Sequence, residues 1–298
     1  MSNDQTTPQD PTEQHPKPAG EGQEIPHPGV TSEMREQPDH GEESYQGSER
    51  LSGKRAVITG GDSGIGRAVA LAFAREGADV LISYLPEEEE DAQQTAALVR
   101  DAGRTVVTVP GDIREEQQCL DIVDRALKDL GGLDILVNNA AYQMSQDDGI
   151  LGISTEQLDR VLKTNLYAMF WLCKAAIPHM APGSTIINTA SVQGFDPSPH
   201  LLDYATTKAG IVNFTKGLGA QLAEKGIRVN GVAPGPVWTP LIPATMDADK
   251  VAEFGAQAPL GRAAQPAELA PTYVFLASQE SSYITAEVIA VTGGTPIV

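Results

Sequence analysis

A tyrosine and a lysine stand four residues apart in the segment Tyr204-Ala205-Thr206-Thr207-Lys208. Residues at this spacing lie on the same face of a helix, so we expect the phenol and the ammonium to be neighbours. The ordinary pKa of a tyrosine is about 10, and a nearby ammonium lowers it because it favours the phenolate. Such a tyrosine could donate or remove the proton that hydride transfer at a carbon–oxygen bond requires. Similar pairs are common on exposed helices, so the pair alone predicts little.

Two further polar residues come before this pair. Ser191 follows a predicted strand, residues 184–189, and precedes Tyr204 by 13 positions (204 − 191). Asn165 lies on a predicted helix over residues 155–180. It falls in the apolar stripe of that helix, which consists of Leu158, Leu162, Met169 and Leu172. The stripe predicts that Asn165 faces the sheet, where its side chain must be hydrogen-bonded. A purely structural core asparagine is the alternative for this residue taken alone.

A glycine-rich turn follows the apolar segment 55–59 and precedes a segment of good helix formers. The turn reads Gly60-Gly61-Asp62-Ser63-Gly64-Ile65-Gly66. Strand, glycine turn and helix is the arrangement that binds a dinucleotide pyrophosphate, because glycines let the backbone approach the phosphates and the helix N-terminus presents free N–H groups. A tight turn that uses glycine for its positive φ is the alternative.

Strand and helix patterns alternate from Leu51 onward. The predicted strands are residues 55–59, 78–84, 105–109, 133–137, 184–189, 227–232 and 288–291, and the predicted helices follow the glycine turn and cover 87–102, 115–130, 155–180, 203–225 and 266–277. Near-continuous apolar strands between helices predict an α/β fold with a mostly parallel sheet of about seven strands and helices on both faces. Right-handed crossovers make this a doubly wound (Rossmann) sheet in a single domain, 51–298, whose ligands bind at the carboxyl ends of the strands.

These motifs together resemble the short-chain dehydrogenase/reductase family, from about Leu51 to about Gly294. Asn165, Ser191, Tyr204 and Lys208 match its catalytic tetrad without substitution. The resemblance implies an NAD(P)-dependent oxidoreductase that transfers hydride reversibly between an alcohol and an aldehyde or ketone. Tyr204 would be the general acid/base, Lys208 would also hold the nicotinamide ribose, Ser191 would bind the substrate oxygen, and Asn165 would hold a water in a proton relay.

The resemblance also implies the residues that bind the cofactor. They are Gly60, Asp62, Ser63, Gly64, Ile65, Gly66, Tyr84, Leu85, Asp112, Ile113, Asn139, Ala140, Ala141, Pro234, Gly235, Val237 and Thr239, with Tyr204 and Lys208. Ala141 replaces the last glycine of the family's NNAG motif. For Asp112, a helix N-cap is the alternative or additional role.

The segment after the second strand bears on the choice of nucleotide. Tyr84 occupies the place of the family's NAD-selecting aspartate, and Leu85 falls where some members carry an arginine that binds a 2′-phosphate. The glutamates at 87–90 would repel that phosphate, so NAD is the preferred cofactor and NADP remains open. A solvated helix start is the alternative explanation of the four glutamates.

Residues 239–265 break the periodic pattern and predict a lid over the substrate. The residues expected to contact substrate are Ser191, Gln193 and Tyr204, and the candidate wall residues are Tyr142, Val192, Phe195, Leu202, Trp238 and Ile242. A sugar, a polyol, a small aldehyde or a hydroxylated fused ring would suit this set. An NADPH-dependent 3-oxoacyl reductase is one alternative function, and a non-catalytic dinucleotide-binding sensor or scaffold is another.

The composition narrows the possible partners. The 298 residues carry a net charge of −19, which argues against nucleic acid or an anionic membrane as a partner. No apolar run approaches the roughly 20 residues of a membrane helix, and the N-terminus lacks the pattern of a secretory signal. Cys119 and Cys173 are predicted to be buried free thiols, which suits a cytoplasmic location. We expect no metal site, a small-molecule substrate and, from the resemblance, a homotetramer.

Residues 1–50 are rich in polar residues and proline and have few large apolar side chains. We therefore predict an extended or disordered N-terminal extension. An arm along the body or along a neighbouring subunit is favoured for about residues 20–39, where Ile25 and Met34 could dock, and disorder is favoured before that. On this view, deletion of residues 1–50 leaves cofactor binding intact.

Overall fold

The computed structural model describes residues 7–17 and 22–297 and contains one seven-stranded sheet. The strands are β1 Arg55–Thr59, β2 Asp79–Tyr84, β3 Val106–Pro110, β4 Ile135–Asn138, β5 Thr185–Thr189, β6 Arg228–Pro234 and β7 Val288–Val291. They are all parallel and their order is β3-β2-β1-β4-β5-β6-β7. The order reverses between β1 and β4, and a crevice at such a point is where these sheets bind ligands.

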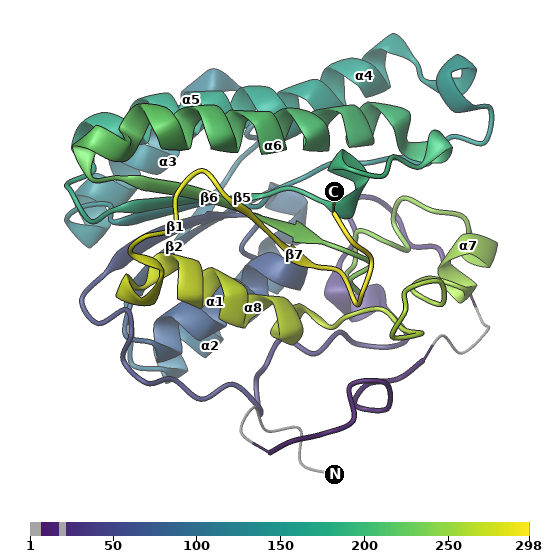
Figure 1. Cartoon of the computed structure of the whole chain (residues 1–298), viewed down its shortest axis with the longest axis horizontal. Coiled ribbons are helices and arrows are strands. Elements are labelled where there is room, and N and C mark those ends of the chain that lie inside the picture. The colour runs from purple at the N-terminus through teal and green to yellow at the C-terminus, as the bar shows by residue number, and fades with distance from the viewer. Residues whose placement is uncertain (1–6, 18–21, 298) are drawn as a thin grey trace.

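Helices cover both faces of the sheet. They are α1 Gly64–Arg75, α2 Glu89–Asp101, α3 Glu116–Arg125, α4 Thr155–Leu162, α5 Ala168–Ala176, α6 Leu202–Leu222, α7 Ala248–Ala252 and α8 Pro266–Ala277. Figure 1 shows α1, α2 and α8 below the sheet and α3, α4, α5 and α6 above it. The predicted doubly wound fold is therefore confirmed, and β1, β7 and α8 have the predicted bounds.

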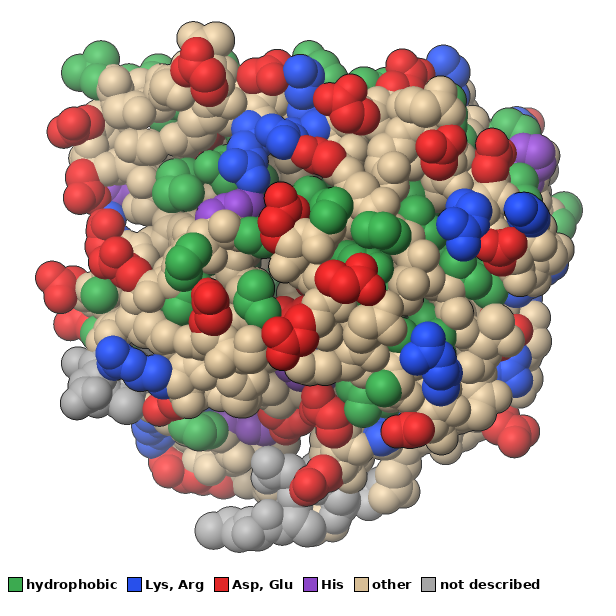
Figure 2. Space-filling model, turned by 180° about the vertical axis from the view of Figure 1, so that it is seen from behind, with side chains coloured by type: hydrophobic (Ala, Val, Ile, Leu, Met, Phe, Trp, Pro, Cys, Tyr) green, Lys and Arg blue, Asp and Glu red, His purple; other side chains and the backbone are tan. Residues whose placement is uncertain are grey.

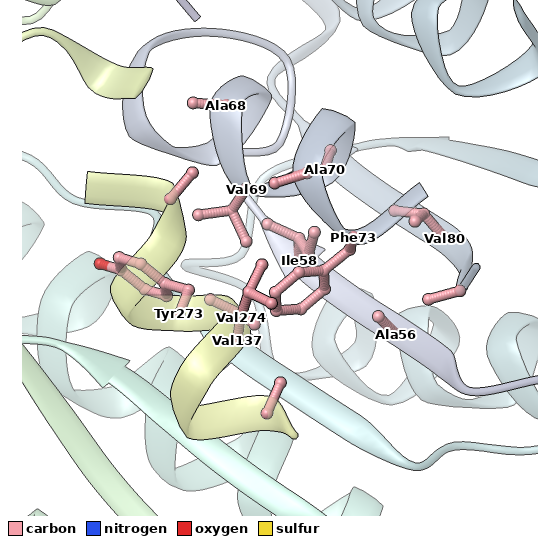
Figure 3. Packing of buried hydrophobic residues seen from close by; sticks show 14 of the residues in the cluster. Ala56, Ile58, Ala68, Val69, Ala70, Phe73, Val80, Val137, Tyr273 and Val274 are labelled. Carbon is pink, nitrogen blue, oxygen red and sulfur yellow. The ribbon is translucent and has the colours of Figure 1, made fainter. Parts of the chain in front are cut away.

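The core beneath the sheet is formed mainly by α1 and α8. The buried side chains that meet there include Ala56, Ile58, Val69, Phe73, Val80, Val137, Tyr273 and Val274 (Figure 3). Burial of a large apolar side chain of this kind stabilises the fold by about 1.5–3 kcal/mol. Because α1 is held against β1 in this way, the turn that joins them has a fixed position at the carboxyl edge of the sheet.

Two predicted helices contain wider turns. Residues 126–130 and 163–167 are π-helical, and the second of these turns contains Asn165. The predicted helix from 155 to about 180 is present as an unbroken helical segment over 155–179, but it contains a π turn in which the Ala168 N–H bonds to the carbonyl of Lys163, five residues back. Leu158 also leaves the predicted apolar stripe, since its side chain is 43% exposed.

We call residues 22–50 the N-terminal arm. The arm lies along the outside of the body, and within it the structure has one short 3₁₀ turn, Thr31–Glu33. In Figure 1 the dark purple chain below the helices is residues 7–17, and the arm begins beyond the following grey segment, beside α7. Of the residues before Gly20, where we expected disorder, 7–17 lie against the body: the guanidinium of Arg262 donates to the carbonyl of Pro11 at 2.8 Å, and His15 is buried. Residues 1–6 and 18–21 lie outside the described residues.

The end of the arm is bound to a buried carboxylate at the end of α1. Glu76 accepts hydrogen bonds from the hydroxyl of Tyr45 at 2.7 Å, the amide of Ser48 at 2.9 Å and the guanidinium of Arg50 at 2.6 Å. Burial raises the pKa of Glu76, but these bonds outweigh burial and bring it to about 2. The carboxylate is therefore ionised at neutral pH, and it fixes the arm to the body.

Several smaller predictions concern the surface and the thiols. Cys119 and Cys173 are buried and unbonded to each other, as predicted. Within residues 7–17 and 22–297, we find no helix with both the length and the apolarity to cross a membrane. Figure 2 shows acidic side chains spread over one face, with Lys and Arg side chains in small groups between them.

Candidate active site

The glycine turn between β1 and α1 is shaped by close backbone contacts. A Cβ on Gly66 would lie 1.7 Å from the carbonyl oxygen of Gly60, so no other residue fits at this position. Gly60 and Gly64 have φ values of +60° and +48°, which only glycine adopts without strain. The first turn of α1 therefore packs directly on the loop, and its N-terminus borders the cavity described below. A dinucleotide pyrophosphate needs this kind of close, strain-free backbone.

The segment after β4 holds the glycine turn in place. The side-chain amide of Asn139 donates to the carbonyls of Thr59 and Gly60 at 3.2 and 3.1 Å. The backbone amides of Asn139 and Ala140 donate to the hydroxyl of Thr59 at 3.0 and 3.1 Å. Asn139 and Ala140 therefore join the ends of β1 and β4 across the point where the strand order reverses.

Three of the four predicted catalytic residues lie together at the ends of β5 and α6. Lys208 is 1% exposed, and its Nζ donates a 2.8 Å hydrogen bond to the carbonyl of Thr189. The same Nζ lies 5.3 Å from the centre of the Tyr204 ring. Ser191 follows β5, and its Oγ accepts a 3.1 Å bond from the amide of Gln193. Tyr204, Ser191 and Lys208 all line one cavity.

Asn165 lies behind this group and does not line the cavity. Its Oδ1 accepts from the amide of Tyr142 at 2.8 Å, and its Nδ2 donates to the carbonyl of Tyr142 and the hydroxyl of Thr207 at 2.9 Å each. These bonds satisfy the buried amide, as the sequence predicted. They join the segment after β4 to α6, and so hold Tyr142 and the helix that carries Tyr204 in fixed relative positions.

The pKa shifts at the site differ from the sequence-based expectation. Burial raises the pKa of Tyr204 to about 12, although a hydrogen bond with Ser191 opposes the shift. Burial lowers the pKa of Lys208 to about 7. The expected lowering of the Tyr204 pKa by Lys208 is therefore wrong for this state of the protein, because burial disfavours the charged form of both groups. Tyr204 is protonated at neutral pH.

The cavity has a volume of about 330 Å³ and runs from the glycine turn to Tyr204. Of the predicted cofactor-binding residues, only Gly66 does not line it, because its role is to let α1 approach the turn. Ser191 and Gln193 also line it, as do the candidate wall residues Tyr142, Val192 and Ile242. Phe195, Leu202 and Trp238 do not, so their assignment to the wall is wrong. No group of three His, Cys, Asp or Glu side chains in the described parts of the chain could hold a metal ion.

Other residues line the cavity that the sequence did not single out as site residues. They include His27, Pro28 and Gly29 of the arm and Glu88, Arg114, Gln143, Arg160, Thr164 and Leu201. Pro240, Leu241, Met246 and Phe254 of the predicted lid line it as well. The predicted lid contributes several of these residues, and it consists of turns and the short helix α7. The arm residues gave no local signal, because their place depends on contacts with distant segments.

The end of β2 presents carboxyl groups to the cavity. The Tyr84 hydroxyl donates to Glu89 at 2.8 Å, and the amide of Leu85 donates to Glu88 at 3.0 Å, so the Glu88 carboxyl lies at the strand end. Asp62 is buried in the glycine turn, and its Oδ2 has no hydrogen-bond partner. Burial raises the pKa of both groups; the charge of Asp91 adds to this at Asp62, and the charge of Asp62 raises the pKa of Glu88 further, to about 9.

Cations lie elsewhere in the cavity. Among the described residues that line it, the cations are Arg114, Arg160 and Lys208, and none of them follows β2. Arg67 is close to Asp62 in the sequence, but its guanidinium is buried and pairs with Asp91 at 2.7 Å. A phosphate at the end of β2 would therefore face carboxyl groups rather than a free guanidinium.

Comparisons with known proteins agree with this geometry. A family model described as enoyl-(acyl carrier protein) reductase matches residues 60–296. The chain is 53% identical over 286 residues to the uncharacterized oxidoreductase YghA of Escherichia coli (strain K12), covering 96% of this chain and 97% of that protein. It is 46% identical to the NADPH-dependent aldehyde reductase 1 of Arabidopsis thaliana, over 91% of this chain and 96% of that one. It is 45% identical to the glucose and ribitol dehydrogenase of Daucus carota, over 90% and 93%.

A solved structure shows the same architecture with a nucleotide. The chain is similar to a short-chain dehydrogenase from Burkholderia cenocepacia in complex with NADP, with a TM-score of 0.76 and 32% identity. The match covers 82% of this chain and 98% of that one.

Proposed function

The chain belongs to the short-chain dehydrogenase/reductase family of NAD(P)-dependent oxidoreductases, and from that premise we propose that it interconverts an aldehyde or ketone and the corresponding alcohol. The observation that carries this proposal is that Tyr204, Ser191 and Lys208 line the same cavity as the glycine turn. The groups suited to proton transfer and those suited to dinucleotide binding therefore share one space. The proposed role of Asn165 is to position this group through Tyr142 and Thr207.

The bound nicotinamide would supply or accept the hydride. Ser191 and Tyr204 would hold the substrate oxygen, and Tyr204 would give it a proton during carbonyl reduction. A phenol whose pKa is about 12 keeps its proton at neutral pH, so this site is ready for reduction and less ready for oxidation. The Lys208 Nζ, which donates to the Thr189 carbonyl, would bind the nicotinamide ribose.

We propose a substrate with a largely apolar body. Leu201, Ile242, Met246 and Phe254 line the cavity, and Leu201 and Met246 pack in one apolar cluster with Tyr204. The hydroxyls of a sugar would lose hydrogen bonds to water against such a wall, which costs free energy. The name of the Arabidopsis relative also favours an aldehyde, whereas that of the carrot relative favours a polyol, so both classes belong in the test.

We propose NAD as the preferred nucleotide, with Glu88 and Asp62 as the reason. These carboxyl groups lie at the end of β2 and in the glycine turn, and neither could pair with a 2′-phosphate as a cation would. A ribose 2′-hydroxyl could instead donate to a carboxyl oxygen. The NADPH-dependent Arabidopsis relative and the NADP complex point the other way, so the preference has to be measured.

A homo-oligomer built on α5 and α6 is a further proposal. Phe170 on α5 is 54% exposed and lies edge-on to Phe214 of α6, with ring centres 4.5 Å apart. Tyr167, in the π turn just before α5, is 48% exposed. Light scattering after size exclusion would test this proposal, and a monomer at micromolar concentration would contradict it.

The decisive experiment measures oxidation of NADH and of NADPH with aldehydes, ketones, sugars and 3-oxoacyl thioesters. We expect the highest kcat/KM with NADH and an apolar aldehyde or ketone. Tyr204→Phe should reduce kcat by about a thousandfold, because the proton donor is lost. Tyr283→Phe is the matched control, since Tyr283 is fully exposed, and it should leave kcat unchanged.

Three outcomes would change the proposal. Turnover that survives Tyr204→Phe would remove Tyr204 from its proposed role. A clear preference for 3-oxoacyl thioesters with NADPH would make the protein an acyl reductase instead. Tight nucleotide binding without turnover of any compound would favour a sensor that keeps the fold without the reaction.

A further inference from the structure

The N-terminal arm is attached to the lid, residues 239–265, by backbone hydrogen bonds. The amide of Ile25 donates to the carbonyl of Pro243 at 3.0 Å. The indole N–H of Trp238, just before the lid, donates to the carbonyl of Glu36 at 2.9 Å. Ile25 is also buried in a small apolar cluster with Ala244. Because a backbone group takes part in each bond, the arm is fixed in position relative to the lid.

Farther along, the arm reaches the other side of the cavity. The amide of Thr31 donates at 2.8 Å to the carboxylate of Asp91, which is buried near the start of α2 and also pairs with Arg67. The amide of Asp39 donates at 2.9 Å to the side chain of Gln265, at the start of α8. The arm therefore extends from the lid to α2, and residues 27–29 lie between these two attachments and line the cavity.

His27 connects this part of the arm to the side of the cavity that carries Asn165. Its ring lies edge-on to Tyr142, with ring centres 5.3 Å apart, and the Arg160 guanidinium lies 3.2 Å from its Nδ1. Burial, followed by the charges of Arg160 and Arg114, lowers the pKa of His27 to about 4. The imidazole is neutral at physiological pH, and Tyr142 in turn is held by Asn165.

We infer that His27, Pro28 and Gly29 are part of the dinucleotide-binding site and that the docked arm slows release of the nucleotide. This inference rests on the proposed function, because it places the cofactor in the cavity that these residues line. Leu85 and Asp112, which the family resemblance assigns to cofactor binding, line the same cavity. The inference reverses the sequence-based expectation that deletion of residues 1–50 leaves cofactor binding intact.

Gly29 offers a sharp test, because it packs directly against the lid. Its φ is +95°, and a Cβ there would lie 2.7 Å from the carbonyl oxygen of Pro240 and 3.0 Å from the Cβ of Ala244. Gly29→Ala should therefore push the arm away from the lid. We expect the rate of NADH release, measured by stopped-flow displacement with excess NAD, to rise about tenfold.

Gly53→Ala is the matched control. Gly53 has a similar φ of +72°, but no atom lies within 4 Å of the position of its Cβ. This variant carries the same kind of backbone strain without a clash, and its release rate should stay within about twofold of wild type. Equal release rates in Gly29→Ala and Gly53→Ala would overturn the inference while leaving the proposed function intact. Failure of the wild-type protein to bind NADH or NADPH at all would overturn both.

A second variant tests the contact without backbone strain. His27→Ala removes the ring from the cavity wall, and we expect NADH release to accelerate about threefold to tenfold. His179→Ala removes an exposed histidine outside the cavity and serves as its control. If His27→Ala and His179→Ala release NADH at the wild-type rate, residues 27–29 are not part of the nucleotide site. NADPH replaces NADH in each assay if it is the tighter ligand.

Discussion

The cavity has two walls that are built in different ways. The catalytic wall consists of β5, α6 and the turn that carries Asn165, and its polar side chains bond to one another and to nearby backbone groups. The opposite wall consists of the N-terminal arm and the lid, which contain little regular structure and are tied together by backbone bonds such as Ile25–Pro243. This difference in construction suggests that the two walls have separate roles. The first wall would set the rate of the chemical step, and the second would set how long ligands stay.

The largest effect should come from the catalytic wall. Ser191→Ala removes the hydroxyl proposed to bind the substrate oxygen, and kcat should fall by about a hundredfold to a thousandfold. The rate of NADH release should not change, because the arm and the lid are untouched. Ser282→Ala, at an exposed position, is the control. A Ser191→Ala variant that altered nucleotide release and left kcat intact would contradict the separate roles of the two walls.

The arm should contribute to stability through Glu76. Glu76→Gln removes a fully buried carboxylate from its pair with Arg50, and we expect the free energy of unfolding to fall by about 3 kcal/mol. Denaturant unfolding measures this loss, and Glu43→Gln, at an exposed arm position, should change little. The kcat of the folded enzyme should stay near wild type. A large drop in kcat would show that the arm also affects the chemical step.

The same carboxylate predicts the direction of a pH effect on stability. The pKa of Glu76 is about 2 in the folded protein, below its ordinary value of 4.5. Its contribution to stability is therefore fully present above about pH 4.5 and is lost as the pH falls toward 2. Glu76→Gln should flatten this part of the stability profile, and an unchanged profile would show that Glu76 does not titrate there.

The pH dependence of activity tests the catalytic wall further. Alcohol oxidation requires the phenolate of Tyr204, whose pKa is raised to about 12. The rate of oxidation should therefore rise about tenfold per pH unit, or about a hundredfold between pH 7 and pH 9, if the bound cofactor leaves this pKa in place. The rate of carbonyl reduction should stay nearly flat over that range. A plateau of the oxidation rate below pH 8 would show that the cofactor brings the pKa of Tyr204 down.

The smallest effect concerns the nucleotide itself. Glu88→Gln removes an ionisable group at the end of β2 whose pKa is raised to about 9. The ratio of kcat/KM for NADPH to that for NADH should therefore change little at pH 7 and rise about tenfold above pH 9, where the wild-type carboxyl is ionised. Glu90→Gln, at an exposed position on α2, is the control. An unchanged ratio in Glu88→Gln above pH 9 would mean that other residues select the nucleotide.

Much of the fold could be predicted from the sequence because its elements are locally encoded. The buried strands are short apolar runs, and the glycine turn indicates the first strand–turn–helix unit. The π turn at Asn165 could not be predicted in this way, because its apolar periodicity does not differ from that of a straight helix. It depends instead on bonds to Tyr142 and Thr207, which lie 23 and 42 positions away.

The two walls of the cavity differ in the same respect. Tyr204, Lys208 and Ser191 could be identified because spacing along a helix and at a strand end fixes their relative places. The contribution of His27 could not be identified from the sequence, because the arm has no periodic pattern. Its conformation depends on contacts with the lid and α2. For Glu88, the sequence indicated a negative charge but not that the backbone of Leu85 would hold its carboxyl at the cavity.

The contacts of the arm also determine when it can fold. The arm is synthesised before every element to which it binds, and its partners include Trp238, Gln265 and Ala267. On the ribosome its bonds to Glu76 and Asp91 become possible within about 60 residues, but the bond from Trp238 to Glu36 must wait for 202 further residues (238 − 36). Its polar, proline-containing composition suits this delay, because such a segment resists collapse and aggregation while it has no partner. Docking of the arm would then be one of the last steps of folding, and it would complete the cavity.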